Sequence, residues 1–537
     1  MIFVDRDARE RINDRNVKSL DLAIIFGYLV GIVLLGAFFA RKQETTRDYF
    51  LGDRTVPWWA IAASIVATET STITFISVPG IAYARGGNFQ FLQLVFGYML
   101  GRIVIALLFI PSYFRGELLT VYQLLERRFG LRIKMLAASL FVVMRNIADG
   151  VRLLLTAIVL AAVYTTFQPQ ANTETIIISS IVLLGLVMII FTYFGGMEAV
   201  IWIEVVQLGI YIAGATAAAV ILSNNIPGGF SGALALGTQY DKFNVFDFTF
   251  DATKTFTFWA GLVGGCFLTM STHGTDQYLV QRYLCTDAAR RASIALLSSG
   301  AVVLAQFIGF LMIGVLLFAF YQPYADPSYA SLAPAQSAFP FTGGDRVFPD
   351  FITKHMPSGL SGLVVAAIFA AALSSSLNSI AATALNDLYK PFRPARDDRH
   401  YLRVSHYLTL LWGVVQITVA LAIRNSSRSA LDQALSIASL INGPVLGVFL
   451  VGTFLRRVSE PPALIGMVAS ILFMLYVRFG TSIAWTWYVL IGSTVTFLVA
   501  LVASFAFAPA PLSQQDQLAP GGGVNNSMLL TETETTK

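Results

Sequence analysis

Residues 57–82 read PWWAIAASIVATETSTITFISVPGIA, and this stretch decides the fold. It is long enough to cross the hydrocarbon core of a bilayer as a helix, which takes about 20 residues. Its centre, residues 67–74, nevertheless holds six polar side chains among eight residues. Ser and Thr side chains compete for backbone hydrogen bonds, and irregular backbone inside a membrane must line protein or a cavity. The pattern predicts a helix broken mid-membrane at a site; the alternative is a seam of small residues between packed helices.

The whole chain has the composition of an integral membrane protein. Of its 537 residues, 56% are hydrophobic and 12% are charged, and the mean hydropathy is +0.68. A soluble domain carries about 25% charged residues, and a disordered chain has low hydrophobicity, so both classes are excluded. We expect an all-α protein with about thirteen transmembrane helices. They cover residues 20–40, 57–82, 89–112, 135–163, 175–194, 198–223, 255–281, 293–320, 360–388, 403–423, 430–455, 461–478 and 485–507.

The distribution of Lys and Arg predicts the orientation. Loops that follow odd-numbered spans hold most of them, including Arg282, Arg290 and Arg291 after the seventh span. Cytoplasmic loops carry the positive excess, so the N-terminus lies outside and the C-terminus in the cytoplasm of the cell membrane. The net charge of +5 then reflects orientation. The partners we expect are the lipid bilayer and a small-molecule solute, with no nucleic acid, and we expect a monomer.

Two further spans contain polar clusters. In the ninth, Ala371, Ser374 and Ser375 share one helical face, because they are spaced at i, i+3 and i+4. Two hydroxyls beside the free carbonyls of a broken helix suit a hard cation such as Na⁺, although a Ser pair alone is more often packing. In the seventh span, Thr272 and His273 lie in a polar run with glycine. His273 is a candidate solute donor or proton carrier, or simply a satisfied buried histidine.

Glu204 is a carboxylate within the sixth span, where Gln207 and Tyr211 share its face. No cation lies near it on its own helix, so it needs a partner, a proton or an ion. In the fourth span, Arg145, Asp149 and Arg152 are spaced to neutralise one another as an intrahelical ladder. We interpret that ladder as structural and Glu204 as a candidate for ion or proton coupling.

The two interrupted spans at 57–82 and 255–281 begin two units of five helices each. An odd number of helices per unit inverts the second unit relative to the first, and matching interruptions in two halves point to a transporter's binding site. The organisation that follows is an external head (1–18), an extra helix with a cytoplasmic loop (19–56), the first repeat (57–223), an external loop (224–254), the second repeat (255–456), two C-terminal helices (457–507) and a disordered cytoplasmic tail (508–537).

Four motifs resemble the sodium/solute symporter family. They are Asp48-Tyr49-Phe50-Leu51-Gly52 with Val56-Pro57-Trp58-Trp59, Thr192 to Trp202 (TYFGGMEAVIW), Asp276-Gln277 with Val280 to Leu284 (VQRYL), and Asn386 to Pro391 (NDLYKP). The resemblance covers roughly residues 20–505 and implies a LeuT-like fold with an extra N-terminal helix. It also implies sodium-coupled uptake of a small polar organic solute or anion by alternating access, with Na⁺ as the co-transported ion.

The resemblance assigns the main sodium site to the carbonyls of Ala67, Thr70 and Ala371 and the hydroxyls of Ser374 and Ser375. Where the family usually has an acidic Asp in the sixth span, this chain has Glu204, which leaves a second sodium site open. The candidate solute contacts, drawn from the second, third, seventh and eleventh spans, are Glu69, Thr74, Gln90, Gln93, Thr272, His273 and Gln433. The motifs do not choose among sugar, monocarboxylate, vitamin and anion substrates.

Two other functions compete with sodium symport. The same fold could be proton-coupled through Glu69, Glu204 or His273, and sodium-independent uptake that depends on pH would favour that function. A transporter-like receptor is the other alternative, and a large cytoplasmic signalling domain would mark it. An enzyme is not expected, because no nucleophile–base pair, phosphate loop or metal-ligand spacing is present in the sequence.

Overall fold

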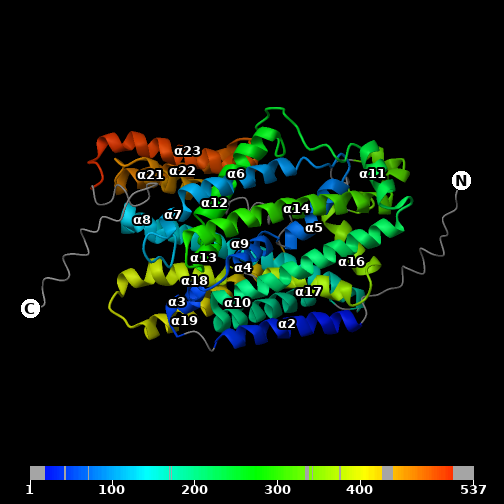
Figure 1. The fold of residues 1–537 in the computed structure, drawn as a ribbon, viewed down its shortest axis with the longest axis horizontal. Helices are drawn as coiled ribbons and strands as arrows, with labels where there is room; N and C mark the ends of the chain where they lie inside the picture. Colours follow the sequence, from blue (N-terminus) through cyan, green and yellow to red (C-terminus); the bar gives the residue numbers. More distant parts are fainter. Residues whose placement is uncertain are drawn as a thin grey trace, which may run out of the picture.

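The computed structural model describes residues 19–40, 44–70, 72–167, 170, 172–332, 338–341, 343–373, 376–425 and 440–511. Every regular element in those ranges is a helix, as the sequence predicts. The long helices run side by side along the longest axis of the molecule, and shorter segments lie between them (Figure 1). The predicted head at 1–18 and nearly all of the predicted tail at 508–537 lie outside the described residues.

The first half of the chain contains both long and interrupted helices. Its elements are α2 (Ser19–Ala40), α3 (Thr46–Leu51), η1 (Gly52–Arg54), α4 (Trp58–Glu69), α5 (Thr72–Tyr83), α6 (Leu92–Leu108), α7 (Ile110–Tyr113), α8 (Tyr122–Arg128), α9 (Leu131–Phe167), α10 (Thr173–Asn225) and α11 (Gly229–Gln239). The predicted fifth and sixth spans are the two arms of α10, which meet at Gly196. There the backbone turns to φ 58° and ψ −160°, a conformation open only to glycine.

The second half of the chain also contains both long helices and interrupted ones. Its elements are η2 (Ala260–Gly264), α12 (Gly265–Gly274), α13 (Gln277–Leu284), α14 (Ala289–Tyr321), η3 (Pro323–Ala325), α15 (Ser328–Ser331), η5 (Gly344–Arg346), α16 (Val347–His355), α17 (Leu360–Leu373), α18 (Leu377–Thr383), η6 (Ala384–Tyr389), η7 (Lys390–Phe392), α19 (Asp398–Ala422), α21 (Asn442–Phe454), α22 (Glu460–Gly480), η8 (Trp485–Trp487), α23 (Tyr488–Ala503) and η9 (Ser504–Ala506).

The predicted break in residues 67–74 is present. Helix α4 ends at Glu69, α5 begins at Thr72, and the two helices are bent by 59°. In the seventh span, α12 ends at Gly274, and the Asp276 side chain starts α13 by accepting a hydrogen bond from the Tyr278 amide at 2.9 Å. Interrupted helices therefore begin both predicted repeats.

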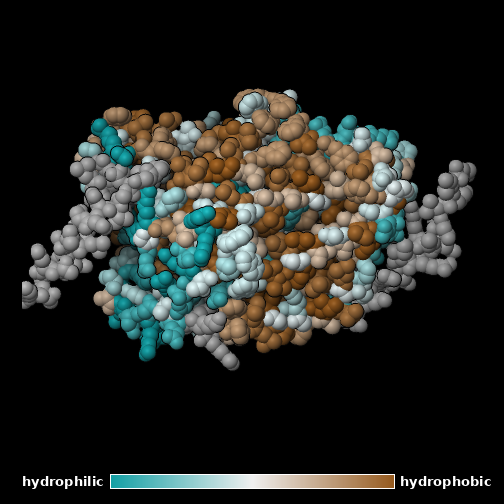
Figure 2. All heavy atoms as spheres, in the orientation of Figure 1, coloured by the Kyte–Doolittle hydropathy of each residue, from teal (hydrophilic) through white to brown (hydrophobic). Residues whose placement is uncertain are grey.

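The surface of the long helices is apolar, as a bilayer requires. Large side chains such as Phe26 on α2, Ile212 on α10 and Leu472 on α22 are more than half exposed. Figure 2 shows such residues covering the middle of the molecule, with hydrophilic residues gathered toward its ends. Among the described residues, five helices are long and apolar enough to span a membrane, or six if the bent α4–α5 pair counts as one span. The count of thirteen stays a prediction.

Candidate functional site

The break between α4 and α5 is held in place by hydroxyl contacts. Thr70 donates its hydroxyl to the Val66 carbonyl at 2.7 Å, and the Thr74 hydroxyl donates to the Glu69 carbonyl at 3.1 Å. Gln306, from the middle of α14, donates its side-chain amide to the Thr70 hydroxyl at 2.6 Å. Ala67 and Thr70 are both buried. A distant helix therefore fixes the position of the broken segment.

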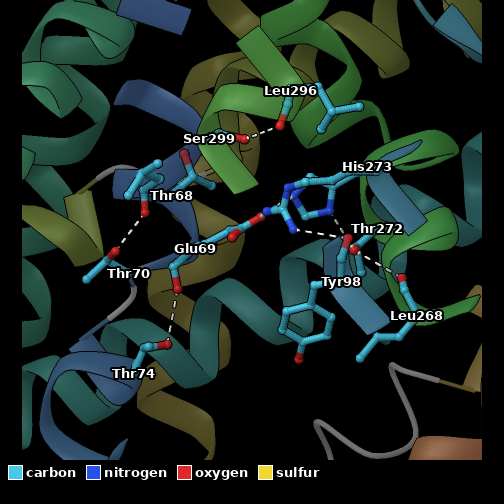
Figure 3. Close-up of polar contacts among 12 residues, drawn as sticks. Thr68, Glu69, Thr70, Thr74, Tyr98, Leu268, Thr272, His273, Leu296 and Ser299 are labelled. Atoms are coloured by element: carbon cyan, nitrogen blue, oxygen red, sulfur yellow. Dashed lines mark hydrogen bonds and ion pairs between the residues drawn. The ribbon is translucent and has the colours of Figure 1, made fainter. Parts of the chain in front are cut away.

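A charged cluster lies at the end of α4. The Glu69 carboxylate contacts both the Arg102 guanidinium of α6 and Nε2 of His273 in α12, and Figure 3 shows the carboxylate extended toward the imidazole. The Thr272 hydroxyl lies 3.0 Å from Nδ1 of His273 and 3.1 Å from the Leu268 carbonyl. A carboxylate at a helix C-terminus is unfavourable by itself. The two basic side chains compensate it and join three helices.

This cluster forms one side of a cavity of about 440 Å³. Glu69, Thr74, Thr272 and His273, all predicted as solute contacts, line it. Thirteen further residues complete the wall: Thr68, Ser77, Val78, Ile81, Phe91, Tyr98, Arg145, Arg152, Leu268, Thr269, Tyr278, Leu279 and Phe307. A mostly apolar wall with a few convergent polar and charged groups is the usual form of a small-molecule site.

Two arginines of α9 reach the same cavity. Arg145 pairs with Asp276 across the break of the seventh span, Nη2 to Oδ2 at 2.5 Å. Arg152 lies 3.7 Å from Asp149 on its own helix. The Asp149 carboxylate also accepts hydrogen bonds from the backbone amide and hydroxyl of Ser376, at 3.1 and 2.5 Å. The predicted ladder is therefore only partly intrahelical, because its carboxylate binds Ser376 just before α18 and its first arginine binds Asp276 just before α13.

Glu204 has the partner that its burial requires. Arg282 donates to the two carboxylate oxygens at 2.5 and 3.3 Å, and both side chains are fully buried. The hydroxyls of Ser64 and Thr68 on α4 also donate to this carboxylate. The placement of Arg282 in a cytoplasmic loop was wrong: it lies inside α13 and neutralises a buried acid, so it should not be counted as a loop cation.

The other predicted site residues are dispersed. Gln90 and Gln93 are not among the described residues that line the cavity. The Gln93 side chain instead bonds the main chain of Gln90, Asp247 and Phe256. Ala371 lies near the end of α17. Ser374, Ser375 and Gln433 lie outside the described residues.

Sequence reasoning missed Arg102 and misassigned Arg282. Both are fully buried cations, Arg102 inside the apolar helix α6 and Arg282 inside the short helix α13, whose sequence mixes polar and apolar residues. A charged residue within a membrane span is costly without a partner, and that rule applies to Arg102, which stands alone in the run of residues 89–112. Applying it would have paired Arg102 with one of the few intramembrane carboxylates.

The comparisons with known proteins agree with this geometry. The family model described as "Sodium:solute symporter family" matches residues 49–470. This protein belongs to the sodium:solute symporter family. The predicted family resemblance is thereby confirmed, and the chain is a sodium-coupled symporter of the membrane and not an enzyme. Sodium symport is supported over the proton-coupled and receptor alternatives, with Na⁺ as the co-transported ion.

Several curated relatives match nearly the whole symporter. It is 31% identical to the sodium/sialic acid symporter SiaT of Proteus mirabilis over 505 residues, which is 91% of this chain and 96% of the relative. It is also 31% identical to the sodium/sialic acid symporter NanT of Aliivibrio fischeri, covering 91% and 94%. The human sodium/iodide cotransporter is 28% identical over 82% of this chain and 66% of its own length.

Two solved structures have a similar fold. A substrate-bound, outward-open Na⁺-coupled sialic acid symporter aligns with a TM-score of 0.80 and 30% identity over 92% of this chain and 99% of its own. The nucleobase-cation-symport-1 transporter Mhp1 aligns with a TM-score of 0.55 at 13% identity over 87% and 97%, which shows the shared fold alone. The symporter is thus an all-helical transporter with LeuT/Mhp1-like fold neighbours.

Proposed function

We propose that this symporter carries an acidic sugar of the sialic acid class into the cell with Na⁺. Two relatives that align over nearly their whole length are named as sodium/sialic acid symporters. More distant relatives are named for iodide and for monocarboxylates, so several of the named substrates in this group are anions. The alternating-access mechanism and the direction of uptake belong to the same proposal.

The observation that carries the substrate class is the pair of arginines in the cavity wall. Arg145 and Arg152 line it together with His273, and a guanidinium binds a carboxylate through two parallel hydrogen bonds. The hydroxyls of Thr68, Thr74 and Thr272 lie in the same wall and suit a polyhydroxylated ring. An acidic sugar combines one carboxylate with many hydroxyls, which matches this set of donors and acceptors.

We infer that Na⁺ binds between the break of α4 and the end of α17, held by Ala67, Thr70, Ala371, Ser374 and Ser375. The hydrogen bond from Gln306 holds Thr70 in position. For Glu204, we propose a role in coupling in which an ion or proton competes with Arg282 for the carboxylate, since the guanidinium already contacts both of its oxygens.

The topology is part of the proposal. We propose thirteen spans in a 5+5 inverted repeat with an extra N-terminal helix, an external N-terminus and a cytoplasmic C-terminus. The proposal also includes the domain boundaries given above and a monomeric state. The matching interruptions at α4–α5 and α12–α13 support the repeat, and the apolar surface of the long helices supports insertion in the cell membrane.

Uptake into proteoliposomes tests the function. An inward Na⁺ gradient should drive accumulation of labelled sialic acid, and choline in place of Na⁺ should abolish it. Arg152→Gln should raise the KM about tenfold or more, because a hydrogen bond to a charged group contributes about 1.5–3 kcal/mol. Arg291→Gln, at an exposed ion pair near the start of α14, is the matched control. Sialic acid uptake that is equal in Na⁺ and choline would refute the proposal.

Stabilisation by Na⁺ tests the ion site separately. A ligand at 100 times its Kd adds about 2.7 kcal/mol to stability, so wild-type protein should melt at a higher temperature in Na⁺ than in choline. Ser374→Ala and Ser375→Ala should each lose that gain and still insert into the membrane. A wild-type sodium response in both variants would place the ion elsewhere.

A further inference from the structure

A second hollow lies on the outer surface of the helix pair α10–α14, apart from the solute cavity. It has a volume of about 420 Å³, and its walls are almost wholly apolar. The second arm of α10 supplies Ile212 and Ala215, α14 supplies Val302 and Gly309, and Phe230 of α11 lies at one end. We call this hollow the α10–α14 groove. Apart from Gln306, which holds Thr70 in position, its residues have no part in the function proposed above.

The surroundings of the groove determine what can fill it. Both walls belong to helices that are long and apolar enough to cross a membrane. Its rim residues Ile212, Val302 and Phe230 are 52%, 41% and 46% exposed, so the groove is continuous with the lipid-facing surface. The polar groups of Tyr211, Thr216 and Gln306 in its walls already donate to protein oxygens, and the rest of the wall offers water no hydrogen-bond partner. Hydrocarbon is the matching occupant of an apolar groove that opens on the apolar surface of two long helices.

The groove also contacts the broken helices directly. On one wall, the Gln306 side chain donates to the Thr70 hydroxyl at 2.6 Å. On the other wall, the Tyr211 hydroxyl donates to the Ala367 carbonyl of α17 at 3.0 Å. Thr70 and α17 contribute to the two halves of the proposed sodium site. An occupant that holds these walls in place therefore acts on both halves at once.

We propose that the α10–α14 groove binds one acyl chain of a membrane phospholipid, which holds Gln306 and Tyr211 in place and so stabilises the sodium site. Binding of the lipid chain does not depend on the proposed function, whereas stabilisation of the sodium site rests on it. Filling the groove removes the void between α10 and α14 and gains dispersion contacts along both walls. Loss of the chain leaves the two halves of the sodium site free to separate.

Glycine substitutions provide a matched test. A Cβ added at Gly309, inside the groove, meets nothing within 4 Å, and the same is true of Gly209 on α10, which does not line the groove. Gly309→Leu should therefore fill the groove without a clash, and Gly209→Leu makes the same chemical change outside it. Ala215→Leu, on the opposite wall, serves as a second filling variant if Gly309→Leu folds poorly.

The first measurement is phospholipid bound to purified protein, by native mass spectrometry after detergent washing. Wild type and Gly209→Leu should each retain a phospholipid that Gly309→Leu and Ala215→Leu lose. Adding phospholipid to delipidated protein should raise the Tm of the first pair and leave the second pair unchanged. Equal retention in all four proteins, or detergent bound in place of lipid, would overturn the proposal.

The second measurement is the Na⁺ concentration that gives half of the sodium-dependent Tm gain. In wild type it should rise about threefold when the lipid is removed, which corresponds to about 0.65 kcal/mol of coupling. Gln306→Leu should keep the lipid and lose this dependence. A sodium response that is identical with and without lipid would refute the coupling. A wild type with no sodium response would instead refute the sodium site, and the lipid measurement would still decide the groove.

Discussion

Thr68 and Glu69 are adjacent on α4, yet they face two carboxylate clusters of opposite character. Thr68 donates to Glu204, whose side chain is fully buried with that of Arg282. Glu69 is paired with Arg102 and His273, and its side chain is 15% exposed in the wall of the solute cavity. The C-terminal end of α4 thus contacts two charged clusters. We call Glu204 with Arg282 the closed pair, and Glu69 with Arg102 and His273 the open cluster.

The difference shows how the symporter combines rigidity with binding. The Glu204–Arg282 pair joins α4, α10 and α13, because Ser64, Thr68 and Arg282 all donate hydrogen bonds to the carboxylate. In the open cluster, Glu69 and His273 line the solute cavity, and Arg102 is buried against them. Groups in a cavity wall can contact a solute directly, whereas a fully buried pair acts either by holding helices together or, as in the coupling proposed above, by exchanging the partner of its carboxylate. Replacing one residue at a time distinguishes the two roles.

The largest expected effect comes from the closed pair. Glu204→Gln leaves Arg282 buried without a counter-charge, and breaking a buried pair in this way costs about 3–5 kcal/mol. Thermal unfolding in detergent should show a large loss for Glu204→Gln and for Arg282→Met alone. The double variant Glu204→Met with Arg282→Met should recover most of it, because no lone charge stays buried. A double variant as unstable as the singles would mean that the charges themselves are required, as in ion coupling.

The open cluster should respond in binding more than in stability. Glu69→Gln keeps an oxygen acceptor for Arg102 and His273 but removes a negative charge from the cavity wall. We expect a smaller loss of Tm than for Glu204→Gln and tighter binding of sialic acid, by about 1 kcal/mol or roughly fivefold in Kd. Isothermal titration in saturating Na⁺ measures it. Weaker binding would show that the Glu69 carboxylate contacts the solute directly.

The sequence predicted the features that depend on local pattern. Residues 67–74 combine hydroxyls and an acid inside an apolar span, and the structure breaks the helix there. Thr272 and His273 form a polar run in the seventh span, and they line the cavity with Glu69 and Thr74. These signals lie in the composition of single helices, so no tertiary information was needed to find them.

Pairing between distant helices was beyond the sequence. Glu204 visibly required a partner, but Arg282 lies 78 residues away and resembled a loop cation at the end of its span. Gln93 was a reasonable solute contact by position, yet its amide is used by the main chain of Asp247 and Phe256 in the segment before η2. Which polar group faces a cavity and which faces another helix depends on helix rotation, and this rotation is set by packing across the whole bundle.

Lys242 extends the comparison to a buried charge outside the helices that are long and apolar enough to span a membrane, and its effect appears only as a change with pH. Its ammonium group donates to the carbonyls of Tyr83 and Ala84 at 3.2 and 2.6 Å and lies over the Phe318 ring. Burial lowers the pKa of Lys242 from 10.5 to about 7. Between these two values the unfolded chain binds the proton and the folded chain does not, so this residue makes stability rise with pH across that window.

Below pH 7 the amine is protonated in both states, and its contribution no longer changes with pH. The Tm of wild type minus that of Lys242→Met should therefore increase from pH 7 toward about pH 9, with the subtraction removing the shared titration of other groups. A constant difference would mean that the ammonium keeps its proton in the fold. Carbonyl oxygens and an aromatic ring would then compensate a buried charge as completely as Glu204 compensates Arg282. A carboxylate partner would not be required to keep a cation charged inside this fold.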